Sequence, residues 1–473
     1  MKFSSINFKN LYVVTCIVLV AKLLVLGYFL YNNALLSYFN CNGIALDGND
    51  TRGYIVPILD FMAGNGYGPP CRLPGYLPFV YVLSIFFSSM AIIKNLIVAL
   101  QILLASLAIA IIINYLHDVI KNRLLLLITA FVLAFNTYTG IWDIFIMADS
   151  FASSFAIISV FLLSNMNLSK SKILVSSCLL IWSVFFRSAN IIFIPVCAAY
   201  LFYLFYPLGL KKNLQYMLIF LLPIITSLGV WTYRNYKVEN ELIILTTNKN
   251  CFTDNPEQYF EMIKIPAALG MDFTWGTDGE YFIDARVKMP AKVIENAVTK
   301  EFSVEDILRL RADYLHSLKD SSQVNIVELI DRMSSYRQSY SKTYPWRYYV
   351  SNPIKLTAMF LFPYKLDNLI LPKRNDMSKF QFGLKAAYLI SLWMISLLFI
   401  LNIFATAYRI LLSKSFRPFL FEILVLALPA TFIFAHTFLI GYIEQRYLAG
   451  AYLMMVINAA LFLNYLFTLR DKK

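Results

Sequence analysis

The sequence predicts an all-α polytopic membrane protein with about ten transmembrane helices, outer juxtamembrane helices and a small soluble segment at the outer face. Of the 473 residues, 59% are hydrophobic and 15% are charged. A soluble core of this size could not bury so much apolar surface. The apolar runs are about 20 residues long, which is the length of a membrane-spanning helix and not of a barrel strand.

The apolar runs predict ten spans with both termini inside. The first run is too long for a signal peptide and has no small-residue cleavage site, so we expect a retained anchor. The apolar stretches 76–90 and 353–371 are short, and we expect them to be juxtamembrane. The ten expected spans are 11–31, 92–116, 123–142, 148–165, 171–186, 189–207, 212–233, 384–410, 417–440 and 447–468.

Three segments follow from this pattern. Residues 1–234 are expected to form an N-terminal transmembrane catalytic module, with a first outer loop at 32–91. Residues 235–352 are mixed and charged, which favours a soluble segment on the outer face. Residues 353–473 are expected to hold C-terminal juxtamembrane and transmembrane helices. No internal repeat is evident, and this disfavours an inverted-repeat transporter.

The net charge of +13 reflects topology more than a nucleic-acid partner. Basic residues fall at the chain ends and in short loops between apolar runs, as at Lys121, Arg123, Lys211 and Lys212. Such loops are cytoplasmic by the positive-inside tendency. We therefore expect membrane lipids as partners and no nucleic acid, with a smaller part of the charge left for an anionic ligand outside.

The six cysteines show no metal-ligand spacing. Cys41, Cys71 and Cys251 would face the outer compartment. A Cys41–Cys71 disulfide and free thiols both stay open.

The stretch from Asp47 to Pro78 is a polar, Gly- and Pro-rich island after the first span. Its acids and arginines cannot lie in hydrocarbon, so it must lie at the membrane face or in a wet cavity. We expect the chemistry of the protein here.

Polar and ionisable groups of this stretch and of later segments lie on one expected side of the membrane. Ionisable groups at membrane depth are rare unless they serve a site. The set comprises Asp50, Arg52, Arg72, Asp143, Asp149, Arg187, Arg234, Asn235, His436, Glu444, Gln445 and Arg446.

Several of these residues also have structural interpretations. Asp50 could be the N-cap of an amphipathic helix that starts near Tyr54. Asp149 opens a span, where the helix dipole favours an acid. Arg187 could pair with a neighbouring acid or anchor at the lipid headgroups.

The late outer turn has the same ambiguity. Glu444 and Arg446 are two residues apart and do not face each other on a helix, so each could be structural. His436 could be a core histidine.

Four motifs in this order resemble the C-type membrane glycosyltransferases that use a lipid-phosphate sugar, a group that includes protein O-mannosyltransferases and bacterial aminoarabinose transferases. The first motif is the loop DTRGYIVPILDFMAGNGYGPPCRLPGYLPF, and the second is WDIFIMADSFASSFAII, whose acid opens a span. The third is WTYRNYKVENELIILTTNKN after a central span. The fourth is IEQRYLAGAYLMM at the start of the last span. The resemblance covers most of the chain except the body of the soluble stretch.

The resemblance implies a GT-C-like fold and an inverting transfer of a sugar from a polyprenyl-phosphate donor to a glycan, lipid or protein acceptor. It implies Asp50 as the catalytic base, with Asp149 orienting the acceptor or supporting the base. Asn49-Asp50 stands where the mannosyltransferases have Asp-Glu, which keeps Asp47 open as the base. The residues expected to bind the donor phosphate or substrate are Arg52, Tyr54, Arg72, Arg187, Arg234, Asn235, Glu444, Arg446 and Tyr447.

No nucleotide or other cofactor is required by this chemistry, although Asp50 and Asp149 could hold a divalent metal. Two alternative functions stay open: a lipid or solute transporter or flippase, and a polymerase or ligase of lipid-linked glycans. The expected location is a bacterial inner membrane, with the active site facing the periplasm or exterior.

Overall fold

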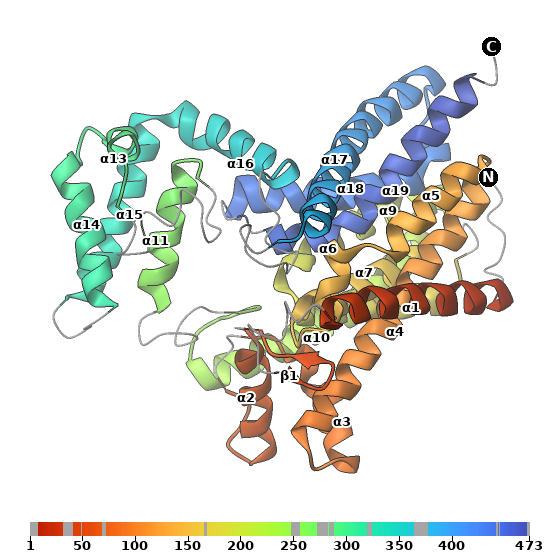
Figure 1. The fold of residues 1–473 in the computed structure, drawn as a ribbon, viewed down its shortest axis with the longest axis horizontal. Helices are drawn as coiled ribbons and strands as arrows, with labels where there is room; N and C mark the ends of the chain where they lie inside the picture. Colours follow the sequence, from red (N-terminus) through yellow and green to blue (C-terminus); the bar gives the residue numbers. More distant parts are fainter. Residues whose placement is uncertain are drawn as a thin grey trace. The chain divides into compact units, whose positions relative to one another are not determined.

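The computed structural model shows an all-α polytopic membrane protein, drawn in Figure 1. Helices make up almost all of its regular structure, and one two-stranded antiparallel sheet accompanies them. The structure describes residues 8–31, 41–48, 50–68, 72–164, 168–246, 256–271, 282, 288–318, 324–363, 377–440, 443 and 445–470.

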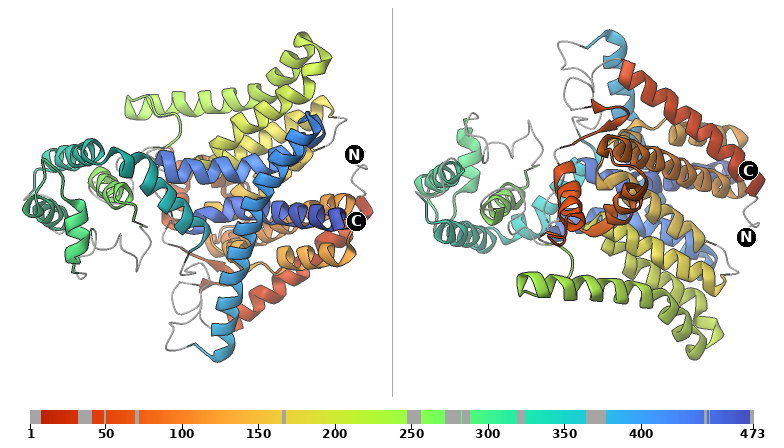
Figure 2. Two further views of the ribbon diagram at one scale, coloured as in Figure 1. Left: turned by 90° about the horizontal axis from the view of Figure 1, so that it is seen from above. Right: turned by 90° about the horizontal axis from the view of Figure 1, so that it is seen from below.

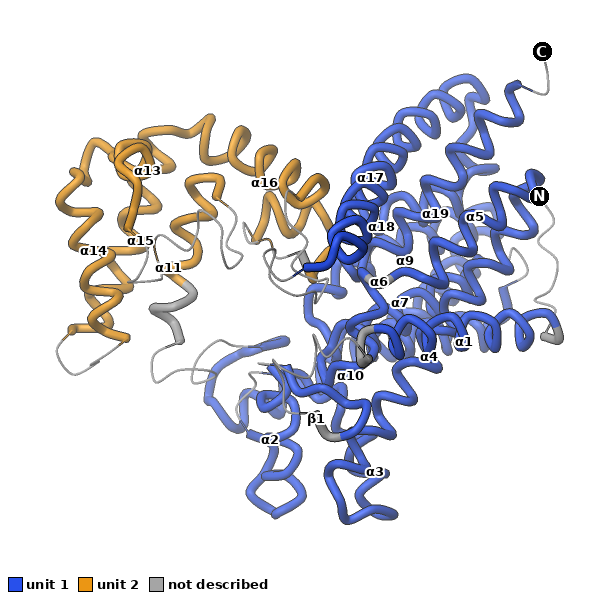
Figure 3. Tube along the Cα trace, viewed as in Figure 1, with its two compact units in different colours: residues 1–246, 365–432, 449–473 blue, residues 247–364, 433–448 orange. Residues whose placement is uncertain are grey.

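The described chain divides into two compact units, coloured separately in Figure 3. Unit 1 contains residues 1–246, 365–432 and 449–473, and unit 2 contains residues 247–364 and 433–448. This division differs from the three segments expected from the sequence, because the C-terminal helices pack with the N-terminal ones within unit 1. Each unit is described below by itself.

Unit 1 holds most of the long helices. In Figures 1 and 2, the start of α1 and the end of α19 lie at one end of this unit, and the β1–β2 hairpin with α2 lies at the other end. Its elements are α1 (Phe8–Tyr31), β1 (Cys41–Asn42), β2 (Ala45–Leu46), α2 (Thr51–Met62), η1 (Pro74–Tyr76), α3 (Leu77–Phe86), α4 (Met90–Val119), α5 (Arg123–Ala134), α6 (Thr137–Gly140), η2 (Ile141–Asp143), α7 (Ala148–Leu162), α8 (Lys170–Phe186), η3 (Ser188–Ile192), α9 (Phe193–Phe205), η4 (Tyr206–Leu208), α10 (Leu210–Glu239), α17 (Lys379–Ser413), η8 (Arg417–Phe419), most of α18 (Leu420–Phe434) and most of α19 (Gln445–Arg470).

Eight helical segments among the described residues are long and apolar enough to cross a membrane. Two of the ten expected spans, 148–165 and 171–186, correspond to the shorter helices α7 and α8. With 15 and 17 residues, they measure about 22 and 25 Å, less than the roughly 30 Å of a hydrocarbon core. The count of ten therefore stays a prediction. Helix α3, with ten residues, is too short to cross, as expected for a juxtamembrane element.

Helices α7 and α8 pack tightly because their facing residues are small. The Ser159 and Ser176 hydroxyls lie 2.9 Å apart, and the Ser183 hydroxyl donates to the Ala152 carbonyl at 2.7 Å. Small side chains let helix backbones approach closely inside a membrane, and cross-helix hydroxyl bonds add to this contact. Almost all of α7 is buried as a result, which places its first turn firmly within unit 1.

The C-terminal helices join unit 1 through buried asparagines. Asn402 on α17 donates to the Asn458 side chain on α19 at 2.8 Å, and Asn458 donates to the Val425 carbonyl on α18 at 3.0 Å. The Tyr388 hydroxyl on α17 donates to the Phe135 carbonyl after α5 at 3.0 Å. A polar side chain buried in an apolar bundle is costly unless it is hydrogen-bonded. These bonds therefore fix which helix faces meet.

Unit 2 has a hydrophobic core of its own, built from helices in 256–361. Met262, Leu310, Met333 and Tyr336 lie at its centre and are almost fully buried. Its elements are α11 (Pro256–Ala268), α13 (Ala291–Ala297), α14 (Val304–Ser317), α15 (Ile326–Thr343), the π-helical turn η6 (Arg347–Ser351), α16 (Asn352–Leu361) and the π-helical turn η9 (Ala435–Ile440). This core explains why the stretch folds as a unit despite its many charges.

A capping box starts helix α14 of unit 2 and should make its stability depend on pH. The Ser303 hydroxyl and backbone N–H bond the Asp306 carboxylate at 2.7 and 2.8 Å. The hydroxyl bond first, and then the backbone bond, lower the pKa of Asp306 below its ordinary 3.8. The capping box therefore stabilises the folded state fully at pH values above the unfolded-state pKa of Asp306. This stabilisation is lost as the pH falls through the lower folded-state pKa of Asp306.

We expect Asp306→Asn to lower the thermal unfolding midpoint at pH 6 and to have a smaller effect at pH 3. Glu305→Gln is the matched control, because it removes a first-turn charge but leaves the box intact. Scanning calorimetry of both variants at the two pH values measures this. An Asp306→Asn effect that is equal at pH 6 and pH 3 would contradict the prediction.

Candidate functional site

The first outer loop is bound to the segment between η2 and α7. Residue Leu46 on β2 bridges Phe145 in parallel, with backbone hydrogen bonds to Ile144 and from Ile146 at 2.9 and 3.0 Å. The Thr51 hydroxyl, at the start of α2, donates to the Ile146 carbonyl at 3.0 Å. The start of α2 therefore contacts Ile146, which lies two residues before the start of α7.

Two side chains inside the bundle also bond the segment between η2 and α7. The Gln101 amide on α4 donates to the carbonyls of Asp143 and Phe145 at 3.0 and 2.8 Å. The Tyr76 hydroxyl lies 2.7 Å from the Met147 carbonyl and 2.8 Å from the Gln101 side-chain oxygen. These bonds satisfy backbone carbonyls that the irregular turn leaves without helical partners. Gln101 was missed by the sequence analysis, although a glutamine inside an apolar span is an unusual polar residue.

Gly75 brings the end of the first outer loop against the end of α8. A Cβ atom at Gly75 would lie 2.7 Å from the Phe185 carbonyl oxygen and 2.8 Å from a ring carbon of Phe186. Only glycine allows the backbone to approach this closely. Because Arg187 follows Phe186 directly, this contact places Arg72 and Arg187 on segments that pack together.

Asp50 and Arg72 form an ion pair at 2.7 Å across the first outer loop. Asp50 occupies the N-cap position of α2, but its side chain makes no capping hydrogen bond. The structural interpretation as an N-cap is therefore confirmed in position, but without a side-chain capping hydrogen bond. The Arg72 guanidinium also lies over the Tyr54 ring, 4.9 Å from its centroid. About a fifth of each charged side chain is exposed, so the pair is accessible to a ligand.

Asp47, the alternative base, has a different environment. The Lys94 ammonium bonds both of its carboxylate oxygens, at 2.8 and 2.6 Å. A bidentate lysine contact holds Asp47 beside α4. The choice of Asp50 or Asp47 as the base stays a prediction.

Asp149 and Arg187 form a second, more buried ion pair. The side chains are 6% and 12% exposed. Asp149 lies in the first turn of α7, where the helix dipole favours an acid. Arg187 directly follows α8 as its C-cap residue. Both structural interpretations of these residues are thus compatible with the arrangement, and so is a role in supporting Asp50.

The end of α10 also reaches the first outer loop. Arg234 donates to the Gly68 carbonyl, and its guanidinium lies between the rings of Tyr67 and Trp231, at 5.5 and 5.2 Å from their centroids. Asn235 donates to the Ile243 carbonyl at 2.8 Å, which makes it a positioning residue for the chain after α10. No carboxylate among the described residues of unit 1 forms an ion pair with Arg234. Its charge is therefore available for an anion.

The remaining expected site residues lie elsewhere in unit 1, in unit 2 or outside the described residues. Arg52 is exposed on α2. Arg446 and Tyr447 belong to unit 2, where the Arg446 guanidinium lies 5.4 Å from the Tyr447 ring centroid. The His436 ring, 4% exposed, packs 5.1 Å from Tyr447. Glu444, Cys71 and Cys251 lie outside the described residues. The choice between a Cys41–Cys71 disulfide and free thiols therefore stays open.

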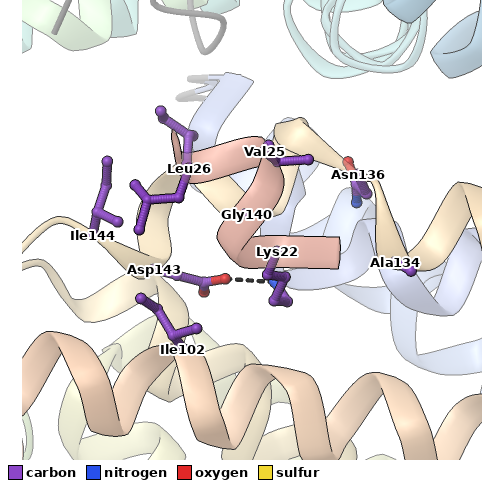
Figure 4. Close-up of a pocket in the computed structure, with 10 residues that line it drawn as sticks. Lys22, Val25, Leu26, Ile102, Ala134, Asn136, Gly140, Asp143 and Ile144 are labelled. Carbon is purple, nitrogen blue, oxygen red and sulfur yellow. Dashed lines mark hydrogen bonds and ion pairs between the residues drawn. The ribbon is translucent and has the colours of Figure 1, made fainter. Parts of the chain in front are cut away.

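A buried ion pair inside the membrane region was missed by the sequence analysis. Lys22, in the apolar part of α1, pairs with Asp143 (Figure 4), and the Ser150 hydroxyl donates to Asp143 at 2.6 Å. Lys22 and Asp143 are 7% and 4% exposed. The signal was present in the sequence, because a single lysine within the 19-residue apolar stretch Asn10–Tyr28 requires a partner. Ser150 follows Asp149 in the sequence, so its bond to Asp143 also fixes the first turn of α7.

A small cavity lies beside this pair, between α1, α4 and the segment that follows α5 (Figure 4). Its volume is about 380 Å³, including open space at its mouth. Val25, Leu26, Ile102 and Ile144 make most of its wall apolar.

No set of three or more metal-ligating side chains gathers in the described part of the chain. The expectation that no cofactor is required, with a divalent metal as an option, stays a prediction. Comparison with protein-family models, curated proteins and solved structures finds no match for this chain. The inference of function therefore depends on the residues and their geometry.

We expect Lys22→Met to destabilise unit 1 by about 3–5 kcal/mol, because it leaves a buried carboxylate without its counter-charge. Adding Asp143→Asn should recover most of this loss, since the asparagine oxygen can still accept from Ser150. Thermal unfolding of both variants in one detergent measures the difference. If the double variant were less stable than Lys22→Met, the pair would not be the source of the effect.

We expect Gly75→Ala to destabilise unit 1 by about 1–3 kcal/mol, because the new methyl group overlaps a backbone oxygen that cannot rotate away. Gly383→Ala on α17 is the control. A Cβ there meets no atom within 4 Å, so this change should be neutral or stabilising. Equal unfolding midpoints for the two variants would show that the Gly75 contact is not tight.

Proposed function

We propose that this protein is an inverting glycosyltransferase that moves a sugar from a polyprenyl-phosphate carrier to a glycan, lipid or protein hydroxyl at the outer face of the membrane. The observation that carries the proposal is the Asp50–Arg72 pair, at 2.7 Å, in a loop bound to the segment that carries Asp149. An accessible carboxylate beside guanidinium groups matches a reaction that needs a base for the acceptor and cations for a phosphate leaving group.

Arg72 pairs with the proposed base and can also bind the donor phosphate. In the ligand-free protein its charge is matched by Asp50. A donor phosphate entering the loop would compete for the same guanidinium, since arginine forms forked hydrogen bonds with phosphate. Donor binding would thereby release the Asp50 carboxylate toward the acceptor. Arg234, held by the Gly68 carbonyl and two aromatic rings, adds a second cation for the phosphate.

The chemical step balances without a cofactor. Asp50 takes the proton of the acceptor hydroxyl, and the acceptor oxygen forms a bond to the anomeric carbon of the sugar. The bond from that carbon to the phosphate oxygen breaks, and its electron pair stays with the polyprenyl phosphate. A single displacement inverts the anomeric configuration. Asp149, held by its ion pair with Arg187, supports the segment on which the base rests.

One observation favours a second candidate, a lipid or solute transporter. Lys22 and Asp143 place an ion pair within the apolar spans, which is where transport pathways carry ionisable residues. In the proposed transferase this pair is structural, and the neutral double change Lys22→Met with Asp143→Asn should keep activity. In a transporter that uses the pair, the same double change should abolish function.

We expect Asp50→Asn to reduce transfer by about 10²–10⁴-fold, the usual contribution of a general base, while the protein still folds and inserts. The measurement is mass analysis of surface glycans and lipids from cells that carry the wild-type or the variant protein. A mass difference of one sugar would identify donor and acceptor class together.

Asp60→Asn is the matched control, because Asp60 is an acid on the same helix α2 outside the ion-paired cluster. It should leave the glycan pattern unchanged. Loss of transfer in Asp47→Asn together with full activity in Asp50→Asn would move the base to Asp47. No mass difference with or without the protein in any glycan or lipid would reject the transferase and favour transport.

A further inference from the structure

Unit 2 carries an exposed stripe of aromatic and apolar side chains along η6 and the start of α16. We call Trp346, Tyr349 and Ile354 the aromatic stripe; their exposed fractions are 70%, 62% and 55%. Trp346 and Tyr349 are three residues apart, and Ile354 follows on α16 after the π-helical turn η6. Single exposed apolar residues are ordinary, but a continuous stripe marks a binding surface.

The opposite face of the same helix is fixed to the rest of unit 2. Leu356 and Phe360 are 1% exposed. The Asn352 side chain donates to the Ala268 carbonyl at 2.6 Å, and the Thr357 hydroxyl donates to Thr437 at 2.9 Å. The helix is therefore held on its inner side, and the aromatic stripe is a stable outer surface.

Charge around the aromatic stripe has one sign. The sequence from Arg332 to Phe362 contains no aspartate or glutamate. Arg332 is neutralised by Asp313 at 2.6 Å, and Arg337 is neutralised by Glu261. The remaining cations, Lys342, Arg347 and Lys355, are exposed beside the stripe.

We infer that the aromatic stripe binds the anionic surface of the lipid bilayer. Tryptophan and tyrosine favour the headgroup level of a membrane, where a ring can be half buried and its polar atom wet. Basic residues beside an apolar face add attraction to anionic lipids. The eight apolar helical segments keep a bilayer next to this chain at all times. The inference is independent of the transferase proposal.

The test uses full-length protein in lipid nanodiscs that contain brominated lipid, with or without phosphatidylglycerol. The emission of wild-type protein minus that of Trp346→Phe isolates the signal of Trp346. Brominated lipid should remove most of this signal when phosphatidylglycerol is present. Replacing Lys342, Arg347 and Lys355 by glutamine should restore it, and so should high salt.

The matched control places a tryptophan at Val327 in the Trp346→Phe protein. Val327 is 71% exposed on α15 and lies outside the aromatic stripe, so its signal should not be quenched by the lipid. Equal quenching at both positions, or none at Trp346, would overturn the inference. Equal quenching with neutral lipid alone would overturn the assignment to anionic lipid. Shielding of Trp346 from aqueous iodide without lipid quenching would overturn it in favour of a protein surface.

Discussion

The candidate site depends on one constraint, the satisfaction of the backbone carbonyls between Asp143 and Met147. This turn enters the bundle without helical hydrogen bonds of its own, and an unpaired carbonyl in apolar surroundings is costly. The donors come from Gln101, Thr51 and Tyr76. Supplying them requires the first outer loop to lie over the turn, and that closure brings the two acid–arginine pairs to neighbouring segments.

The pairing of charges serves both folding and the proposed chemistry. Each acidic side chain in the cluster forms an ion pair with a cationic side chain from another part of the chain. The pairs are Asp47 with Lys94, Asp50 with Arg72, and Asp149 with Arg187. Burial of single charges would oppose folding, whereas matched pairs offset part of that cost. The exposure of the Asp50–Arg72 pair separates it from the more buried Asp149–Arg187 pair. The Asp50–Arg72 pair is therefore suited to exchange with a ligand, and the Asp149–Arg187 pair is suited to structural support of the site.

Composition and run length were enough to predict an all-α membrane protein, because hydrophobicity over 20 residues is a local property of the chain. The locations of Asp50, Arg72 and Asp149 on loops that meet were also predictable from the order of polar residues. The ion-pair partners were not, since Lys94 and Lys22 lie far from their acids in sequence and on apolar helices. Arg446 and Tyr447 were expected at the same site, and that expectation stays a prediction. The expected span 148–165 is three residues longer than α7, whereas α8 matches its expected span 171–186 to within one residue.

The bond from Thr51 to Ile146 joins residues 95 positions apart, and this separation has a consequence for biosynthesis. The ribosome adds about 5–20 residues per second, so the first outer loop leaves the insertion machinery roughly 5–20 s before its partner turn exists. During that interval its aspartates and arginines lack the contacts that the 143–147 turn supplies. Maturation of the site therefore awaits synthesis of α7, and a chain arrested before this helix would keep an open loop.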